Sequence, residues 1–541
     1  MKNGFRQSMA WLHTWTGVLL CWLLFAIFVT GTIAYFRQEV TFWMQPELHE
    51  TGAYSPADAP QAARVALDKL AEIAPDAESW SVSLPESRSP TTSISWREQG
   101  APPGRRGFES AVLNPETGER LHPRETAGGN FLYRFHFELY ALPRNVARWI
   151  VGIATAFMFI AIISGIITHK KIFKDFFTFR PAKGQRSWLD MHNVTAVLAL
   201  PFHLMITYSG LLLFMATLLP FAFESGRRGP PTGAREQPQQ VAQAQSVPAP
   251  PVLAPIAPML SQAERIWGMP AGRISIDKPG GDAPRIELAP MRNRKLTAHS
   301  GSGSNGVERL TFDGKTGTLL SESDGPAHSA VSATYNAFGS LHRARFADTA
   351  LRWIFFAAGV AGTVMSATGL LLWVSKRAAK HTKADREPLG LAFVRRLNVG
   401  TIAGLMAAVA AYFWANRLLP AELEARPLWE IRTFFAVWAI LLIYPAFRKV
   451  SRAWPEELAT GAVLFATLPL LDALTTDTNG IDALLRGQWV LVGFDLVALA
   501  TALSLGVAAW KMARSEPARA RKAKTAAPQP AVQPMVTEES S

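Results

Sequence analysis

Six histidines lie within or beside the first long apolar stretches of this 541-residue chain: His13, His136, His169, His192, His203 and His342. A titratable ring is costly in hydrocarbon and is usually kept there for a function. Imidazole is also a common axial ligand of haem iron. The single cysteine, Cys21, excludes an intrachain disulfide and argues against a thiolate metal site. The histidines therefore favour haem as the cofactor.

His192 and His203 are the most informative of the six, because they lie 11 residues apart in one apolar stretch. In a continuous helix, that spacing brings two side chains within about 20° of the same face and about 16 Å apart along the axis. One helix would then give a ligand to each of two haems stacked across a membrane. We therefore predict two haems b, with these two imidazoles as the basis of a redox function.

The other four histidines are the candidate partners, and they fall at two depths: His13 and His169 near the inner ends of their helices, His136 and His342 at the outer ends. Depth pairs His192 with one of the two inner histidines, and His203 with one of the two outer histidines. The sequence leaves both choices open. An interfacial histidine is also commonly a hydrogen-bonded structural residue, and His169, beside two lysines, could be a helix-end residue that reaches towards water.

Arginines near the outer histidines suit the propionate groups of haem, which need cations close to the interface. The candidates are Arg148, Arg343 and Arg352. The alternative is that these arginines only anchor helix ends, and that the aromatic residues around them form the ordinary interfacial belt. No side chain is expected to act as a nucleophile or general base, because electron transfer requires positioned redox centres rather than acid–base groups.

The elements that must hold these side chains are membrane helices. A span needs about 20 mostly apolar residues, and eight blocks approach or exceed that length: 10–35, 147–168, 191–220, 350–374, 398–416, 431–447, 458–474 and 488–510. The loops 169–187 and 375–396 are rich in lysine and arginine, and such loops stay in the cytoplasm. Both termini are then cytoplasmic, in a bacterial inner membrane. Topology also explains the formal net charge of +13 without nucleic acid as a partner.

The first four spans read as an internal duplication. Equivalent positions carry a Ser/Thr-Gly pair: Thr30-Gly31, Ser164-Gly165, Ser209-Gly210 and Thr368-Gly369. Each copy also contains an outer segment with an amphipathic helix (60–74 and 258–268) and a later hairpin (112–121 and 310–319). We expect an α-helical polytopic membrane protein of about eight transmembrane helices with two small α+β periplasmic inserts.

This organisation divides the chain into seven parts. They are the first span (1–36), the first insert (37–146), the second and third spans (147–222), the second insert (223–348) with a flexible Pro/Gln-rich part (223–256), the fourth span (349–376), an appended four-helix bundle without histidine (397–511) and a disordered cytoplasmic tail (512–541).

Five short motifs resemble the PepSY-associated transmembrane (PepSY-TM) family: Leu12-His13-Thr-Trp-Thr-Gly17, Phe135-His136, Leu341-His342, Asp190-Met-His192-Asn and Pro201-Phe-His203. The resemblance covers about 5–376 and implies that the inserts are PepSY modules, each a helix on a small antiparallel sheet. Characterised members are di-haem inner-membrane ferric-siderophore reductases, which release iron(II) in the periplasm. The resemblance implies that chemistry here, with the six histidines as candidate ligands. The four extra helices depart from the family's basic pattern.

Two functions from different classes remain at this stage. The leading hypothesis is a haem-dependent reductase of a ferric siderophore or another iron(III) chelate. Its electrons would come from a quinol or a separate cytoplasmic donor, because the chain has no Gly-rich nucleotide loop. The rival is a non-enzymatic transporter or sensor of an iron chelate or peptide, which would use the inserts as its binding module.

Overall fold

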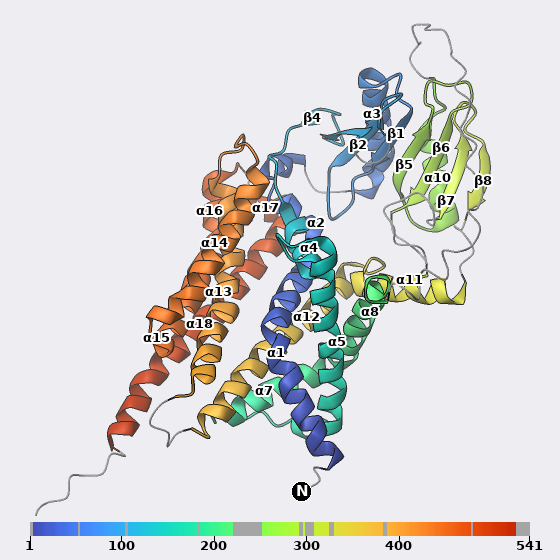
Figure 1. Cartoon of the computed structure of the whole chain (residues 1–541). Coiled ribbons are helices and arrows are strands. Elements are labelled where there is room, and N and C mark those ends of the chain that lie inside the picture. Colours follow the sequence, from blue (N-terminus) through green and yellow to red (C-terminus); the bar gives the residue numbers. More distant parts are fainter. Residues whose placement is uncertain are drawn as a thin grey trace, which may run out of the picture.

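The structure is a computed structural model that describes residues 4–51, 55–102, 107–169, 171–181, 183–219, 252–291, 296–297, 308–323, 329–381, 387–477 and 480–525. The long helices lie side by side with their axes roughly aligned, and a β-sheet with two helices lies beyond one end of them (Figure 1). We call that end the sheet side. Most of the predicted Pro/Gln-rich segment 223–256 lies outside the described residues.

Seven helical segments among the described residues are long and apolar enough to cross a membrane, and a bent pair makes up to eight. The seven are α1 (Phe5–Ala34), α5 (Arg144–Thr168), α12 (Thr349–Ala378), α13 (Leu389–Leu418), α14 (Arg426–Phe447), α15 with α16 (Val450–Ala466 and Leu468–Thr475) and the first part of α18 (Trp489–Thr525). The protein is therefore a mostly helical, multi-pass membrane protein. All eight apolar blocks of the sequence fall on these helices or on the bent pair.

The bent pair corrects the sequence prediction of one continuous third span. The helices α7 (Gln185–Leu198) and α8 (Leu200–Leu218) meet at 69°. Pro201 lies in the first turn of α8, where it lacks an amide N–H and its ring would clash with the carbonyl four residues earlier in a continuous helix. α7 packs against α12, whereas α8 packs against α5 and α11 (Ala330–Arg343). His192 and His203 therefore lie on different helices and do not share a face.

The two outer segments form one eight-stranded antiparallel sheet in the order β4-β3-β2-β1-β5-β6-β7-β8. The first segment gives α3 (Ala59–Ile73), β1 (Ser79–Ser83), β2 (Thr92–Arg97), β3 (Phe108–Leu113) and β4 (Arg120–Leu121). The second gives α10 (Ile256–Trp267), β5 (Ala271–Asp277), β6 (Arg285–Pro290), β7 (Arg309–Asp313) and β8 (Leu319–Ser323). The order of elements is the same in both, and β1 pairs with β5 with Ser81 opposite Ser275.

The predicted hairpins form because their turns have the required chemistry. Gly118 and Gly317 adopt positive φ angles of 73° and 72°, and their amides donate to the carbonyls of Asn114 and Asp313. Along the strands, apolar side chains alternate with polar ones. The apolar face packs with α3 and α10 in one hydrophobic core. The opposite, polar face is on the side of the membrane helices.

The last membrane helices form a bundle that is bound tightly to the first half. The buried Glu430 of α14 accepts hydrogen bonds from Thr126 Oγ (2.8 Å), the Ala127 amide (2.9 Å), Asn416 (2.7 Å) and Arg426 (2.6 Å). Thr126 and Ala127 immediately precede α4 (Gly128–Glu138). The bundle therefore holds the start of α4 in place. At the other end of the chain, α18 continues to Thr525, so 512–525 is helical and not a disordered tail.

The remaining described helices are short and connect the longer elements. They are α2 (Arg37–Trp43), α6 (Ile172–Phe176), α17 (Gly480–Leu485) and the two 3₁₀ helices η1 (Pro46–Thr51) and η2 (Pro56–Asp58).

Candidate functional site

The structure brings four of the six predicted histidines together as two pairs. The ring centres of His13 and His192 lie 6.3 Å apart, with the ring planes inclined at 70°. The ring centres of His136 and His342 lie 6.2 Å apart, with an inclination of 42°. The first pair joins α1 to α7, and the second joins α4 to α11 on the sheet side. Each pair joins two positions that the sequence predicts to be equivalent in an internal duplication.

Each paired ring is hydrogen-bonded through Nδ1 to a neighbouring helix. His13 Nδ1 lies 2.8 Å from the Ala161 carbonyl oxygen of α5. His136 Nδ1 lies 2.8 Å from the Ile27 carbonyl oxygen of α1, and His192 Nδ1 lies 3.0 Å from that of Met365 in α12. Each of these carbonyls is four residues before the glycine of a Ser/Thr-Gly pair. The Ser/Thr-Gly pairs of the sequence therefore mark the places where the histidine rings pack against neighbouring helices. We call these four places the histidine seats.

The fourth ring, His342, is bonded to the Ser209 hydroxyl oxygen of α8 at 2.9 Å. That hydroxyl donates its own proton to the Met205 carbonyl at 2.7 Å, so it can only accept from His342 Nδ1–H. For the other three rings, the partner is a backbone carbonyl, which is an acceptor only. All four rings thus carry their proton on Nδ1. The lone pair is then on Nε2, and no hydrogen bond to these four Nε2 atoms occurs among the described residues. Four imidazole nitrogens remain able to bind a metal.

The four glycines let the rings approach the helix backbone closely. A Cβ atom on Gly31 would lie 2.5 Å from Cε1 of His136, and one on Gly165 would lie 3.1 Å from Cε1 of His13. The corresponding distances are 3.2 Å from Gly210 to His342 and 3.4 Å from Gly369 to His192. A side chain at these positions would push on the ring, most of all at Gly31.

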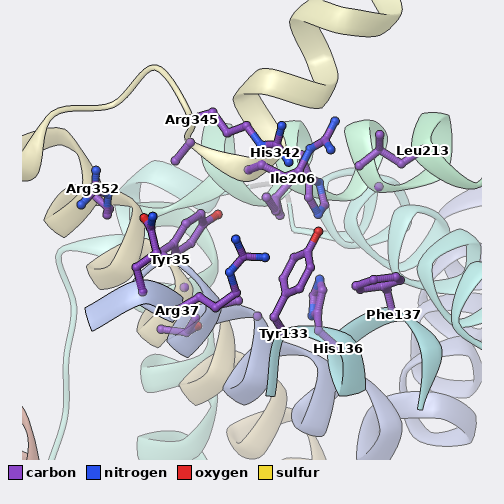
Figure 2. Close-up of a pocket in the computed structure, with 18 of the residues that line it drawn as sticks. Tyr35, Arg37, Tyr133, His136, Phe137, Ile206, Leu213, His342, Arg345 and Arg352 are labelled. Atoms are coloured by element: carbon purple, nitrogen blue, oxygen red, sulfur yellow. The ribbon is translucent and has the colours of Figure 1, made fainter. Parts of the chain in front are cut away.

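The outer pair, His136 with His342, faces a cavity of about 950 Å³. Its deeper walls are mostly apolar and come from the membrane helices, with Leu24, Phe28, Met158 and Phe214 among them. Figure 2 shows His136 and His342 approaching each other from two helices, with Tyr133 and Arg37 beside them. Burial, and then the charge of His136, lowers the pKa of His342 to about 3, so its ring is neutral at physiological pH.

His169 and His203 do not join these pairs, which corrects the predicted partnership of His203 with an outer histidine. His203 is buried beside Phe28 and Phe202, and neither of its ring nitrogens has a hydrogen-bond partner among the described residues. His169 Nε2 lies 2.9 Å from the amide nitrogen of Asn193. Of the two inner partners left open for His192, the structure places His13 against it.

The three predicted propionate partners, Arg148, Arg343 and Arg352, all line the cavity. Arg148 is paired with Glu138 at 2.7 Å, and Arg352 with Glu39 at 3.1 Å. Burial raises the pKa of Glu138, but three surrounding arginines outweigh it and hold that pKa below its ordinary value. The Glu138 carboxylate is therefore ionised, and the two ion pairs keep Arg148 and Arg352 in position at the cavity wall.

Comparison with known proteins identifies the family of this chain. The family model described as "PepSY-associated TM region" matches residues 10–376, which include both histidine pairs, the sheet and the cavity. The chain belongs to the PepSY-associated transmembrane family. It is also 27% identical over 403 residues to "Uncharacterized protein PA4219" of Pseudomonas aeruginosa, a match that covers 71% of this chain and 95% of that protein.

The PepSY-TM match ends at residue 376, so the bundle formed by α13 to α18 lies outside it. Within the match, sequence reasoning overlooked Arg37, whose guanidinium carbon lies 4.9 Å from the ring centre of Tyr133 beside the outer pair. It also overlooked the four glycines as seats. The signal for them was present, because a Ser/Thr-Gly pair recurs in every helix that receives a histidine.

Proposed function

We propose that this protein is a di-haem electron-transfer protein that reduces iron(III) chelates, ferric siderophores among them, on its sheet side. The observation that carries the proposal is the pair of facing imidazoles, found twice, each with Nδ1 bonded and Nε2 free. The proposal further places the protein in a bacterial inner membrane, with the sheet in the periplasm and both termini in the cytoplasm. The repeated order of elements supports an internal duplication with two PepSY-like inserts.

The spacing of the rings fits a metal held between two imidazoles. A metal–nitrogen bond of about 2 Å, with the ring centre about 1.1 Å beyond the nitrogen, gives roughly 6.2 Å between ring centres on opposite sides of one ion. The two pairs lie at 6.3 and 6.2 Å. Among the described residues, both Nε2 atoms of each pair lack a hydrogen-bond partner, which leaves them available to a metal.

The number of protein ligands favours haem over a bare metal ion. Among the described residues, no group of three or more His, Cys, Asp or Glu side chains is placed to hold a metal. Protein-bound zinc takes three or four protein ligands, whereas haem brings four nitrogens of its own and needs only axial ligands. Two imidazoles on opposite sides therefore fit the porphyrin case.

Each element then has a defined task. His13 with His192, and His136 with His342, would hold the two haems b, which would supply two one-electron carriers between the two sides of the membrane. The Nδ1 hydrogen bonds fix the tautomer and orientation of each ring. Arg148, Arg343 and Arg352 stand where anionic propionates at the outer site would need cations. A quinol donor would release two electrons and two protons and convert two iron(III) to two iron(II).

The test is the haem content of the purified protein and of ligand variants. We expect a Soret band that shifts on addition of dithionite, and two haems per chain. His342→Ala and His192→Ala should each lose about one haem. The matched control is His169→Ala, which removes a histidine of the same region that belongs to neither pair and should keep both haems.

Two results would decide against the proposal. A colourless protein purified from haem-replete cells would favour the rival, a transporter or sensor without redox chemistry. Equal haem content in His342→Ala, His192→Ala and the His169→Ala control would show that the pairs are not the ligands. If both haems are present, steady-state reduction of an iron(III) chelate with trapping of iron(II) then tests the reductase activity itself.

A further inference from the structure

The cavity at the outer histidine pair has a roof made by the sheet. Arg273 and Ser275 of β5, Glu287 of β6 and Arg309 of β7 line it from above, on the polar face opposite α3 and α10. His136 and His342 line it from below. Figure 1 shows the sheet beyond the ends of the long membrane helices, with α11 lying crosswise below it. The space therefore lies between the sheet and the membrane helices, with the outer histidine pair at its floor.

The wall of this cavity is strongly positive. Nine of the described residues that line it are arginines and two are glutamates. Two more carboxylates, Glu39 and Glu138, pair with wall arginines from behind, so the arginines still outnumber the carboxylates by nine to four.

Several of these arginines have no carboxylate to balance them. Among the described residues, Arg37 and Arg273 make no salt bridge; Arg343 makes none either, but it is the arginine proposed above to face a haem propionate. Arg37 and Arg343 lie close enough to Arg345 that their charges, after desolvation, lower its pKa to about 10. Figure 2 shows Arg37 and Arg345 gathered around the outer histidines. Like charges held together in a partly dry space are unfavourable until an anion enters.

We propose that this roofed cavity binds an iron(III) chelate of net negative charge, with carboxylate or phenolate oxygens on its surface. This inference rests on the proposed function, since it names the substrate class of the same site. Arginine suits such a ligand because its planar fork donates two parallel hydrogen bonds to paired oxygens. The roof arginine Arg273 belongs to the sheet and not to the membrane helices, so it serves the chelate and not a cofactor held between those helices.

Binding can be measured apart from redox chemistry with gallium(III), which replaces iron(III) in chelates and is not reduced. We expect the dianionic gallium(III) complex of diethylenetriaminepentaacetate to bind the whole protein. A cationic gallium(III) trihydroxamate with a pendent ammonium group should bind at least tenfold more weakly. Arg273→Gln should weaken binding of the dianion about tenfold, which corresponds to one lost charged contact, and should leave haem content unchanged. The control is Arg285→Gln, an arginine of β6 that does not line the cavity.

The outcomes separate this inference from the proposed function. Equal binding of anion and cation, or equal effects of Arg273→Gln and Arg285→Gln, would overturn the anionic chelate. Charge-selective binding that depends on Arg273 supports it, whether or not the protein carries haem. If the iron(III) forms of the anionic and the cationic chelate are reduced at equal rates, the proposed reductase function stands and the proposed substrate class is overturned. Loss of the selectivity at high salt is a further expected result, because the cavity is open to solvent ions.

Discussion

Gly31→Ala gives the sharpest test of the histidine seats. The added Cβ would lie 2.5 Å from Cε1 and 2.6 Å from Nδ1 of His136. Non-bonded carbon atoms rest at about 3.5 Å or more, so the imidazole must move by about 1 Å. A metal site tolerates displacements of only about 0.5 Å. The same movement strains the 2.8 Å hydrogen bond between His136 Nδ1 and the Ile27 carbonyl oxygen.

A glycine-to-alanine change at these positions stabilises the helix but crowds the histidine ring, and the balance of these two effects differs between the four seats. Replacement of a helical glycine by alanine stabilises a helix by about 1 kcal/mol. At Gly31, overpacking of about 1–3 kcal/mol and a weakened hydrogen bond of about 1 kcal/mol exceed that gain. At Gly369 the new Cβ meets His192 at 3.4 Å, an ordinary contact, so the helix gain prevails. Gly165 and Gly210, at 3.1 and 3.2 Å, should fall between.

The assay is haem per chain, together with the low-spin optical and EPR signals of the purified variants. We expect Gly31→Ala to lose or perturb the outer haem alone, and Gly369→Ala to keep both haems. Gly17→Ala is the matched control, because it lies on the same helix and its Cβ would meet nothing within 4 Å. Gly31→Ala with two haems and spectra identical to those of Gly17→Ala would refute the seat.

Four further results are expected. His203→Leu should keep both haems and the stability of the parent protein, since the ring is unpaired and its two buried nitrogens are unbonded among the described residues; loss of one haem would restore His203 as a ligand. Glu430→Gln should lower the free energy of unfolding of the detergent-solubilised protein by about 3–5 kcal/mol, because Arg426 is left as an uncompensated buried charge. The control Glu387→Gln removes an exposed ion pair and should lower this free energy by about 0–1 kcal/mol. Ser81→Cys combined with Ser275→Cys should form a disulfide across the opposed strands, whereas Ser95→Cys with Ser275→Cys should not, since two strand spacings put these residues about 9.6 Å apart. Burial, and then the charge of Arg417, lowers the pKa of His49 to about 4. Folding therefore keeps this ring neutral, and its contribution to the free energy of unfolding is complete above pH 6.5. About 2 kcal/mol of that free energy should be lost by pH 5 in a series of thermal melts, and His49→Asn should not show this loss.

Features that depend on neighbouring residues were predictable. The spans follow from the length of the apolar blocks, and the two hairpins follow from Asn114 and Asp313 placed four residues before a glycine. The histidines were recognised from their residue type in an apolar setting. The positive charge at the outer site was recognised in Arg148, Arg343 and Arg352, which do line the cavity.

Features that depend on which helices meet were not predictable from one sequence. Helical periodicity assigned His192 and His203 to a common face, but Pro201 ends that periodicity between them. The rings that lie together, His13 with His192 and His136 with His342, come from helices separated by many residues, and no spacing within one helix encodes that contact. The same holds for Glu430, whose partners Thr126 and Ala127 lie about 300 residues earlier.

The pairing of β1 with β5 has a consequence for biosynthesis. Ser83 and Ala271 end and begin the two strands, and a ribosome working at about 5–20 residues per second needs roughly 10–40 seconds to extend the chain from one to the other. During that interval the margin of β1 is open and able to bind a foreign strand. Until β5 has been made, the first four strands therefore form a sheet with β1 as an unpaired edge strand.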